Sequence, residues 1–225
     1  TVLTGAGMSA ESGVPTFRDA LTGLWARFDP QELATEAAFR AHPQRVWDWY
    51  AERRGAIGQV APNAGHAAIA AFQRRHPGRL TLVTQNVDGL HQRAGSDGTL
   101  ALHGHIAEDR WLDPPRDCCR AGMIEPGRPP RCTVCGNLRR PAVVWFGEML
   151  PEVELAAAQA AAEACDLMLV VGTSGEVHPA AGLAALARQA GAQVLVINPH
   201  PSALDDVAHH GWRETAARAL PALLA

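Results

Sequence analysis

Short apolar runs that end in polar or glycine-containing turns recur along the chain. They occupy residues 1–3, 80–84, 167–171 and 194–197, and each is followed within two residues by Gly, Gln or Asn. Ala-rich segments of helical character, such as residues 152–165 and 180–190, alternate with them. This alternation predicts an α/β fold with a Rossmann-like, doubly wound parallel sheet. Ligands of such sheets bind beyond the carboxyl ends of the strands, so we expect the four turns to gather around one ligand.

Two segments interrupt the alternation. Residues 19–60 are predicted to be largely helical, are rich in Trp and Phe, and contain Pro30 and Pro43. Residues 105–140 are rich in Pro, Arg and Cys and show almost no periodicity. We interpret the first as a helical insertion and the second as a zinc-ribbon-like insertion. Together they are expected to form a small lobe within a single catalytic domain of residues 1–225.

The composition of the chain limits the classes of binding partner that we expect. The 225 residues are 47% hydrophobic and carry a formal net charge of −3, which gives no basis for nucleic-acid binding. No apolar run approaches the roughly 18 residues of a membrane span, so we expect no membrane partner. The start of the chain carries no secretory signal, and we expect a cytoplasmic monomer. Since the chain opens inside a strand-like segment, we also expect a few native residues to precede Thr1.

Four of the five cysteines cluster within 18 positions, at Cys118, Cys119, Cys132 and Cys135. Without a secretory signal, such a cluster favours metal binding over disulfides. Cys132 and Cys135 have the C-x₂-C spacing of a zinc knuckle. The adjacent Cys118 and Cys119 suit one ion less well, because neighbouring side chains point apart. A structural four-cysteine zinc site and a metal-free lobe therefore remain alternative interpretations.

A glycine-rich segment, residues 5–13 (GAGMSAESG), follows the first apolar run. Glycines let a backbone approach a pyrophosphate closely, and a following helix N-terminus favours anionic charge. The spacing is not the ordinary G-x-G-x-x-G of dinucleotide-binding proteins. Taken alone, the segment is equally well explained as a simple tight turn.

Extended to residue 18, this segment resembles the signature of the sirtuin (Sir2) family. Residues 84–91 (TQNVDGLH) resemble the family's T-Q-N-[IV]-D-x-L-H, and residues 102–104 (LHG) resemble its catalytic L-H-G. Residues 143–148 (VVWFGE) resemble its peptide-clamping strand. The set is completed by Gly172, Thr173 and Ser174 with Val177 and Pro179, and by Asn198 with Pro199. The resemblance extends over essentially the whole chain.

The resemblance implies an NAD⁺-dependent protein-lysine deacylase that acts on acyl-lysine proteins or peptides and releases nicotinamide and O-acyl-ADP-ribose. It implies that His103 is the general base, and an imidazole titrates in the range that suits this role. The matching Asn86 orients the ribose and a water, and the matching Asp88 holds the nicotinamide amide. Ordinary roles for these two residues in a turn are the alternative. The residues implied to bind NAD⁺ are Gly5, Ala6, Gly7, Ala10, Glu11, Thr16, Phe17, Arg18, Trp25, Gln85, Asn86, Asp88, Gly172, Thr173, Ser174 and Asn198.

Tyr50 and Arg53 provide the prediction about the substrate. They lie three positions apart in a segment predicted to be helical, so they share a face, and together they can bind a carboxylate. This Tyr-x-x-Arg resembles that of the bacterial and mitochondrial sirtuin subgroup that removes succinyl, malonyl and glutaryl groups, and Ala34 matches the subgroup's small pocket residue. The alternative is an amphipathic helix with an exposed Arg and a half-buried Tyr. The expected peptide contacts, made by adding the peptide as a strand, come from Val144, Trp145, Phe146, Gly147 and Glu148.

The chain departs from the family pattern at one place, and two alternative functions have to be considered. The family places its other cysteine pair where this chain has Trp111 and Pro114. An NAD⁺ glycohydrolase or mono-ADP-ribosyltransferase on the same scaffold would need no acyl pocket, so Tyr50 and Arg53 argue against it. A non-catalytic NAD⁺-binding module would not need His103. We therefore predict a deacylase that prefers acidic acyl groups and retains some deacetylase activity.

Overall fold

A computed structural model describes residues 1–15 and 29–225. Its larger part is a six-stranded sheet in the order β10-β9-β8-β1-β2-β3, and every neighbouring pair is parallel. The predicted Rossmann-like parallel sheet is therefore confirmed. The strands are β1 (Val2–Thr4), β2 (Leu82–Thr84), β3 (Leu100–Ala101), β8 (Leu167–Val171), β9 (Gln193–Ile197) and β10 (His210–Trp212).

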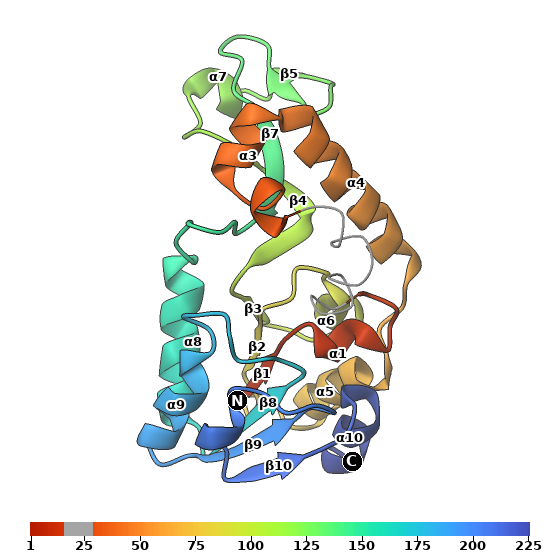
Figure 1. Cartoon of the computed structure of the whole chain (residues 1–225), viewed down its shortest axis with the longest axis vertical. Helices are drawn as coiled ribbons and strands as arrows, with labels where there is room; N and C mark the ends of the chain where they lie inside the picture. Colours follow the sequence, from red (N-terminus) through yellow and green to blue (C-terminus); the bar gives the residue numbers. More distant parts are fainter. Residues whose placement is uncertain (16–28) are drawn as a thin grey trace.

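Helices cover both faces of this sheet (Figure 1). Successive residues of a strand point to opposite faces. Leu3 and Val170 pack against α8 (Glu152–Ala164) and α9 (Gly182–Gln189). Their neighbours Val2 and Leu169 belong to a second cluster with α5 (Ala64–Arg75) and α10 (Ala216–Leu223). Burial on both faces explains why these strands are continuous apolar runs instead of alternating ones.

A second group of elements stands beyond one edge of the sheet and has its own apolar cluster (Figure 1). It contains η2 (Pro30–Glu32), α3 (Glu36–Ala41) and α4 (Pro43–Gln59), packed against the antiparallel pair β4 (Gly104–Trp111) and β7 (Arg139–Val143). We call this group the small lobe. Phe39, Val46 and Trp145 are among its buried side chains. At its tip lie α7 (Asp117–Arg120), β5 (Ile124–Glu125) and β6 (Arg131–Cys132).

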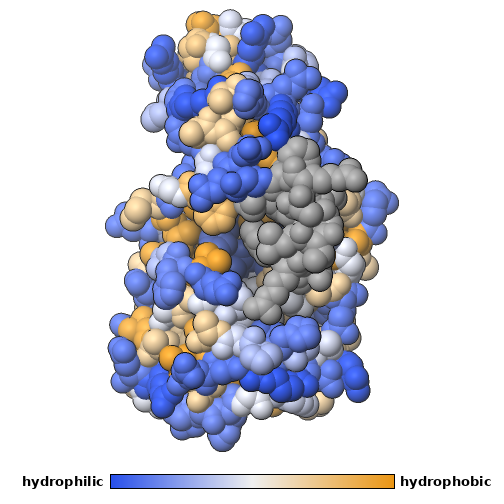
Figure 2. Space-filling view, viewed as in Figure 1, coloured by the Kyte–Doolittle hydropathy of each residue, from blue (hydrophilic) through white to orange (hydrophobic). Residues whose placement is uncertain are grey.

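Three short elements complete the described chain: α1 (Gly7–Ala10), α6 (Leu90–Arg93) and η3 (Asp205–Val207). Within the described ranges, none of the helices combines the length and the apolar character needed to cross a bilayer. Apolar residues gather on the surface at the waist between the sheet and the small lobe (Figure 2). The cavity described next lies between these two parts.

Candidate functional site

A cavity of about 270 Å³ lies where the carboxyl edge of the sheet faces the small lobe. The turn after β1 contributes Ala6, and the turn after β2 contributes Gln85, Asn86 and Asp88. The remaining predicted residues that line it are His103, Ala34, Tyr50, Arg53, Val144, Trp145, Phe146, Gly147 and Glu148. The structure thus brings the predicted catalytic residues and the predicted substrate residues together in one cavity.

The glycine-rich turns after β1 and β8 pack directly on each other. Gly7 N donates a hydrogen bond to Gly172 O over 2.8 Å, and Gly5 N donates to Val171 O over 3.0 Å. Gly172 has a φ of +61°, and a Cβ built on it would lie 2.5 Å from Met8 N. Only glycine fits there. The result is a bare backbone surface at the carboxyl edge of the sheet, which is the kind of surface that accepts a pyrophosphate.

Side chains predicted to bind NAD⁺ connect the turns after β2 and β9 to the turn after β8. Asn198 Nδ2 donates to Thr173 O over 3.0 Å, and Gln85 Nε2 donates to Thr173 Oγ1 over 3.2 Å. The turns after β2, β8 and β9 are therefore joined, as expected for one ligand site. Ser174 lies next to Thr173 and is half-buried.

Two predicted NAD⁺ residues, Glu11 and Ala10, do not line this cavity, and their place in the cofactor site stays a prediction. Glu11 is exposed, and its Oε2 accepts a hydrogen bond from Ala217 N over 3.0 Å, at the first turn of α10. Its carboxylate thus stabilises a helix N-terminus and does not line the cavity. Ala10, in α1, is exposed and is likewise absent from the cavity wall. The predictions for Thr16, Phe17, Arg18 and Trp25 lie outside the described residues.

Ser9 connects Asn86 and Asp88, a role that the sequence analysis did not assign. Ser9 Oγ donates to Asp88 Oδ2 over 2.7 Å and accepts from Asn86 Nδ2 over 3.2 Å. Asn86 Nδ2 also donates to Gly5 O, and Leu90 N donates to Asp88 Oδ1. Both carboxylate oxygens of Asp88 therefore accept a hydrogen bond from within the protein. The only sequence signal was a polar residue within the glycine-rich motif.

Two buried histidines lie behind this network. His66 Nε2 is 3.5 Å from Ser9 Oγ, and His66 Nδ1 accepts from Asn63 N at the start of α5. The His91 ring is 4.7 Å from the His66 ring, and Thr4 Oγ1 is 3.0 Å from His91 Nε2. Burial lowers the pKa of His66 to about 4 and that of His91 to about 3. Both rings are therefore neutral at pH 7 and act as polar packing, not as charges.

His103 is held between β3 and β4 in one tautomer. Its Nδ1 lies 2.8 Å from Gln85 O. A carbonyl oxygen only accepts, so Nδ1 carries the proton and Nε2 keeps a lone pair. Burial lowers the pKa of His103, against the smaller raising effect of the bond to Gln85, so the ring is neutral at pH 7. Gly104 follows with a φ of +76°, and a Cβ there would collide with Ala142 O. This arrangement suits a general base.

The same cavity is lined by Tyr50 and Arg53, which lie three positions apart on α4, as predicted. Tyr50 is 6% exposed, and its hydroxyl accepts a hydrogen bond from Trp145 Nε1 over 3.0 Å. The Arg53 guanidinium lies 4.7 Å from the centroid of the Trp49 ring. Burial raises the pKa of Tyr50 to about 12, although nearby Arg53 opposes the shift. The alternative of an exposed Arg and a half-buried Tyr is therefore not what the structure shows.

Residues 144–147 do not form the expected strand. β7 ends at Val143, and Phe146 makes only an isolated bridge to Thr35. Val144 N donates to His103 O, and Phe146 N donates to Ala34 O, each over 2.9 Å. The segment is thus held by backbone partners from two other parts of the chain, which the local sequence does not reveal.

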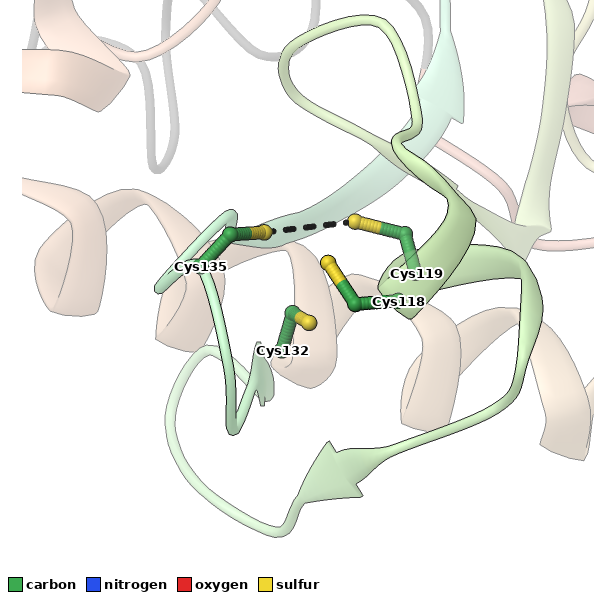
Figure 3. A group of neighbouring side chains, drawn as sticks. All are labelled: Cys118, Cys119, Cys132 and Cys135. Carbon is green, nitrogen blue, oxygen red and sulfur yellow. Dashed lines mark hydrogen bonds between the residues drawn. The ribbon is translucent and has the colours of Figure 1, made fainter.

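The four clustered cysteines converge at the tip of the small lobe (Figure 3). Their sulfur atoms all lie within 4.8 Å of one another, and Cys119 Sγ is 3.4 Å from Cys135 Sγ. Tetrahedral zinc with bonds of about 2.3 Å requires sulfurs about 3.8 Å apart, so the cluster is compatible with a structural zinc ion. Backbone hydrogen bonds, chiefly from Cys135, lower the pKa of the Cys132 thiol to about 7, whereas burial and hydrogen bonds within the cluster raise the pKa of the Cys118 thiol to about 12. The adjacent Cys118 and Cys119 lie on α7, where both side chains reach the same point.

Fold and cavity together define an α/β protein with a dinucleotide-type sheet edge, a small cysteine-bearing lobe and a buried imidazole between them. The sequence profile of the Sir2 family matches residues 5–179. An NAD-dependent protein deacylase of Ralstonia nicotianae is 60% identical over 226 residues, covering 100% of this chain and 90% of that protein. The chain belongs to the Sir2 family.

Solved structures agree with this placement. A Sir2 homologue in complex with NAD has a TM-score of 0.86 and 41% identity, covering 100% of this chain and 87% of that one. A Sir2 complex with a p53 peptide and NAD⁺ has a TM-score of 0.82 and 29% identity, covering 99% of this chain and 90% of that one. Identity at this level over the whole chain supports a shared fold.

Proposed function

We propose that this chain removes acidic acyl groups (succinyl, malonyl and glutaryl) from protein lysines in an NAD⁺-dependent reaction, with some deacetylase activity. NAD⁺-dependent deacylation itself follows from membership in the Sir2 family and from the 60% identical relative named for that activity. The products are nicotinamide, O-acyl-ADP-ribose and free lysine. The preference for an acidic acyl group is the finer claim, and it rests on the cavity.

The proposed acyl preference rests on the observation that Tyr50, Arg53 and Ala34 line the same cavity as His103. An acyl chain that enters between Ala34 and Tyr50 meets a phenol and a guanidinium in a largely buried site. A terminal carboxylate gains charge-assisted hydrogen bonds from both groups. An acetyl group offers only a methyl there and gains neither bond.

His103 provides the chemistry that the chain itself contributes. When bound, NAD⁺ supplies an electrophilic ribose carbon with nicotinamide as the leaving group. His103 Nε2 accepts a proton from a ribose hydroxyl, and Gln85 O holds the Nδ1 proton and stabilises the imidazolium that forms. Asp88 accepts from Ser9 and Leu90, and its remaining lone pairs can accept from the nicotinamide amide.

The remaining parts of the assignment are also proposals. We infer that the peptide lies along residues 144–147, where Gly147 N is an amide with no hydrogen-bond partner among the described residues. The peptide complex of a Sir2 relative supports a substrate of this kind. A monomer in the cytoplasm, acting on proteins without a nucleic-acid or membrane partner, completes the proposal.

The proposal is tested with one peptide that carries acetyl-, succinyl-, malonyl- or glutaryl-lysine. O-acyl-ADP-ribose and free peptide are measured together, so that acyl transfer is separated from plain NAD⁺ hydrolysis. We expect kcat/KM for succinyl-lysine to exceed that for acetyl-lysine by about 10²-fold, which corresponds to about 2.8 kcal/mol. Equal values would refute the acidic preference and leave deacylation standing. NAD⁺ consumption without deacylated peptide would instead indicate a glycohydrolase.

A further inference from the structure

The hydroxyl of Tyr50 is hydrogen-bonded to a second buried side chain, Trp145. The sequence analysis predicted Trp145 as a peptide contact and gave it no role in the acyl pocket. Trp145 is 2% exposed, and its Nε1 donates to Tyr50 Oη over 3.0 Å. An indole N–H can only donate, so the phenol oxygen must be the acceptor. Among the residues that the structure describes, Tyr50 donates no hydrogen bond in return. The phenol proton is therefore available to a ligand in the cavity.

Trp145 itself is clamped and cannot turn away easily. The Arg140 guanidinium lies over its ring, 3.3 Å from the centroid, and Arg140 is 1% exposed. Glu148 forms an ion pair with Arg140 through both oxygens and accepts from Trp145 N over 2.8 Å. Phe39 packs against the same indole at 5.3 Å between centroids. Glu148 is therefore engaged by Arg140 and Trp145 while it also lines the cavity, and its contact with a peptide stays a prediction.

We propose that Trp145 is a positioning residue for acyl selectivity: its indole N–H occupies the Tyr50 oxygen and so directs the phenol proton to the substrate carboxylate. The inference rests on the proposed preference for acidic acyl groups. A phenol can either donate or accept, and a free one could accept from Arg53 or from a water. With one of its two lone pairs engaged by Trp145, the phenol is oriented to donate its proton, which a carboxylate can accept and a methyl group cannot. A hydrogen bond accepted by a hydroxyl also strengthens the bond that the hydroxyl donates.

The burial of Tyr50 also favours donation of its proton to the substrate. It raises the pKa of Tyr50 to about 12, so the phenol stays protonated near neutral pH and remains a donor. The positive charge needed to balance the substrate carboxylate is then provided by Arg53. Trp145 therefore acts through Tyr50 and has no need to touch the carboxylate.

A double-mutant cycle separates this role from general packing. Trp145→Phe keeps an aromatic ring and removes the N–H, and Tyr50→Phe removes the hydroxyl. We expect Trp145→Phe to lower the succinyl-to-acetyl ratio of kcat/KM by about tenfold, equivalent to about 1.4 kcal/mol, in the wild-type background. In the Tyr50→Phe background the same substitution should change the ratio less than twofold. Equal loss in both backgrounds, or no loss in either, would overturn the inference.

The matched control is Phe39→Leu. This change loosens the packing of Trp145 and lowers thermal stability but leaves the N–H in place, so the acyl ratio should stay within twofold. A drop in the ratio equal to that of Trp145→Phe would mean that packing alone sets the selectivity. If the wild type shows no succinyl preference at all, the proposed function fails. If the preference is present without coupling in the cycle, only the role of Trp145 fails.

A spectroscopic measurement needs no variant. Tyr50 is the chain's only tyrosine, so protein labelled with ¹³C at tyrosine Cζ gives a single signal. Without NAD⁺ no turnover occurs, and a succinyl-lysine peptide should shift this signal as the phenol begins to donate to a carboxylate. An acetyl-lysine peptide at the same occupancy should shift it less. Identical shifts with both peptides would refute donation to the carboxylate.

Discussion

Replacing Arg53 by Met is the sharpest test of the acyl pocket, because it keeps most of the side-chain length and removes the charge. Two unit charges 4 Å apart interact by about 4 kcal/mol at an effective dielectric constant of 20. Desolvation of both partners offsets much of this, and a hydrogen bond to a charged group contributes about 1.5–3 kcal/mol net. Burial already lowers the pKa of Arg53, so the guanidinium gains from a carboxylate brought beside it.

The expected result is a loss of about 10- to 100-fold in kcat/KM for the succinyl-lysine peptide, from the same 1.5–3 kcal/mol. Deacetylation should change far less, because an acetyl group does not reach a bond with the guanidinium. The assay measures deacylated peptide by mass spectrometry with both peptides at several concentrations. The ratio of the two kcat/KM values then cancels any common loss of folded enzyme.

The adjacent Arg54 provides the control. Arg54 donates to Ile106 O and forms a partly buried ion pair with Asp109, and these contacts join α4 to β4. Arg54 does not line the cavity. Arg54→Met should therefore lower thermal stability while leaving the succinyl-to-acetyl ratio unchanged. If Arg53→Met slows both substrates by the same factor, the acyl pocket has been misassigned, and deacylation itself stands.

The remaining predictions concern the base, the metal and two buried rings. His103→Ala should lower deacylation by about 10²-fold or more, measured as free lysine peptide, with nicotinamide exchange partly retained; full deacylase activity would refute the assignment. Elemental analysis should find about one zinc per chain, and Cys132→Ser should lose it and loosen the small lobe; active protein purified without zinc would favour the metal-free lobe. Because His66 and His91 have folded pKa values of about 4 and 3, below the unfolded value, the unfolded state binds more protons under pH 6.5. Stability in urea should therefore fall by about 1.2 kcal/mol for each ring between pH 6 and 5, and His91→Gln should remove the contribution of one ring to this slope; an unchanged slope would contradict neutral burial.

Strands β1, β2, β8 and β9 could be predicted because they are largely buried on both faces. The run 167–171 coincides with β8, since an apolar stretch of that length between turn residues has few other interpretations. The pairing of Tyr50 with Arg53 was also predictable, because three positions on one helix fix a shared face. Local periodicity carried both inferences.

Features that depend on distant partners could not be predicted in the same way. Residues 144–147 have strand-like composition, yet only the amides of Val144 and Phe146 bond to backbone carbonyls, those of His103 and Ala34, so no regular strand forms. Adjacent cysteines suggested poor chelation, but α7 turns Cys118 and Cys119 toward one point. For residues 144–147 the deciding partners lie far along the chain, whereas Cys118 and Cys119 are oriented by the short helix α7 that contains them.

The two halves of the cavity therefore differ in how the chain encodes them. The nucleotide edge depends on short turns after consecutive strands, and each turn carries its own motif. The acyl end depends on a hydrogen bond between residues 95 positions apart, Tyr50 and Trp145, and on the Arg140–Glu148 pair that fixes the indole. A chain can thus keep every NAD⁺-binding motif and still lose its acyl selectivity through a change at Arg140 or Glu148. If the proposed preference for acidic acyl groups holds, it is a property of the packing of the small lobe as much as of the Tyr-x-x-Arg motif.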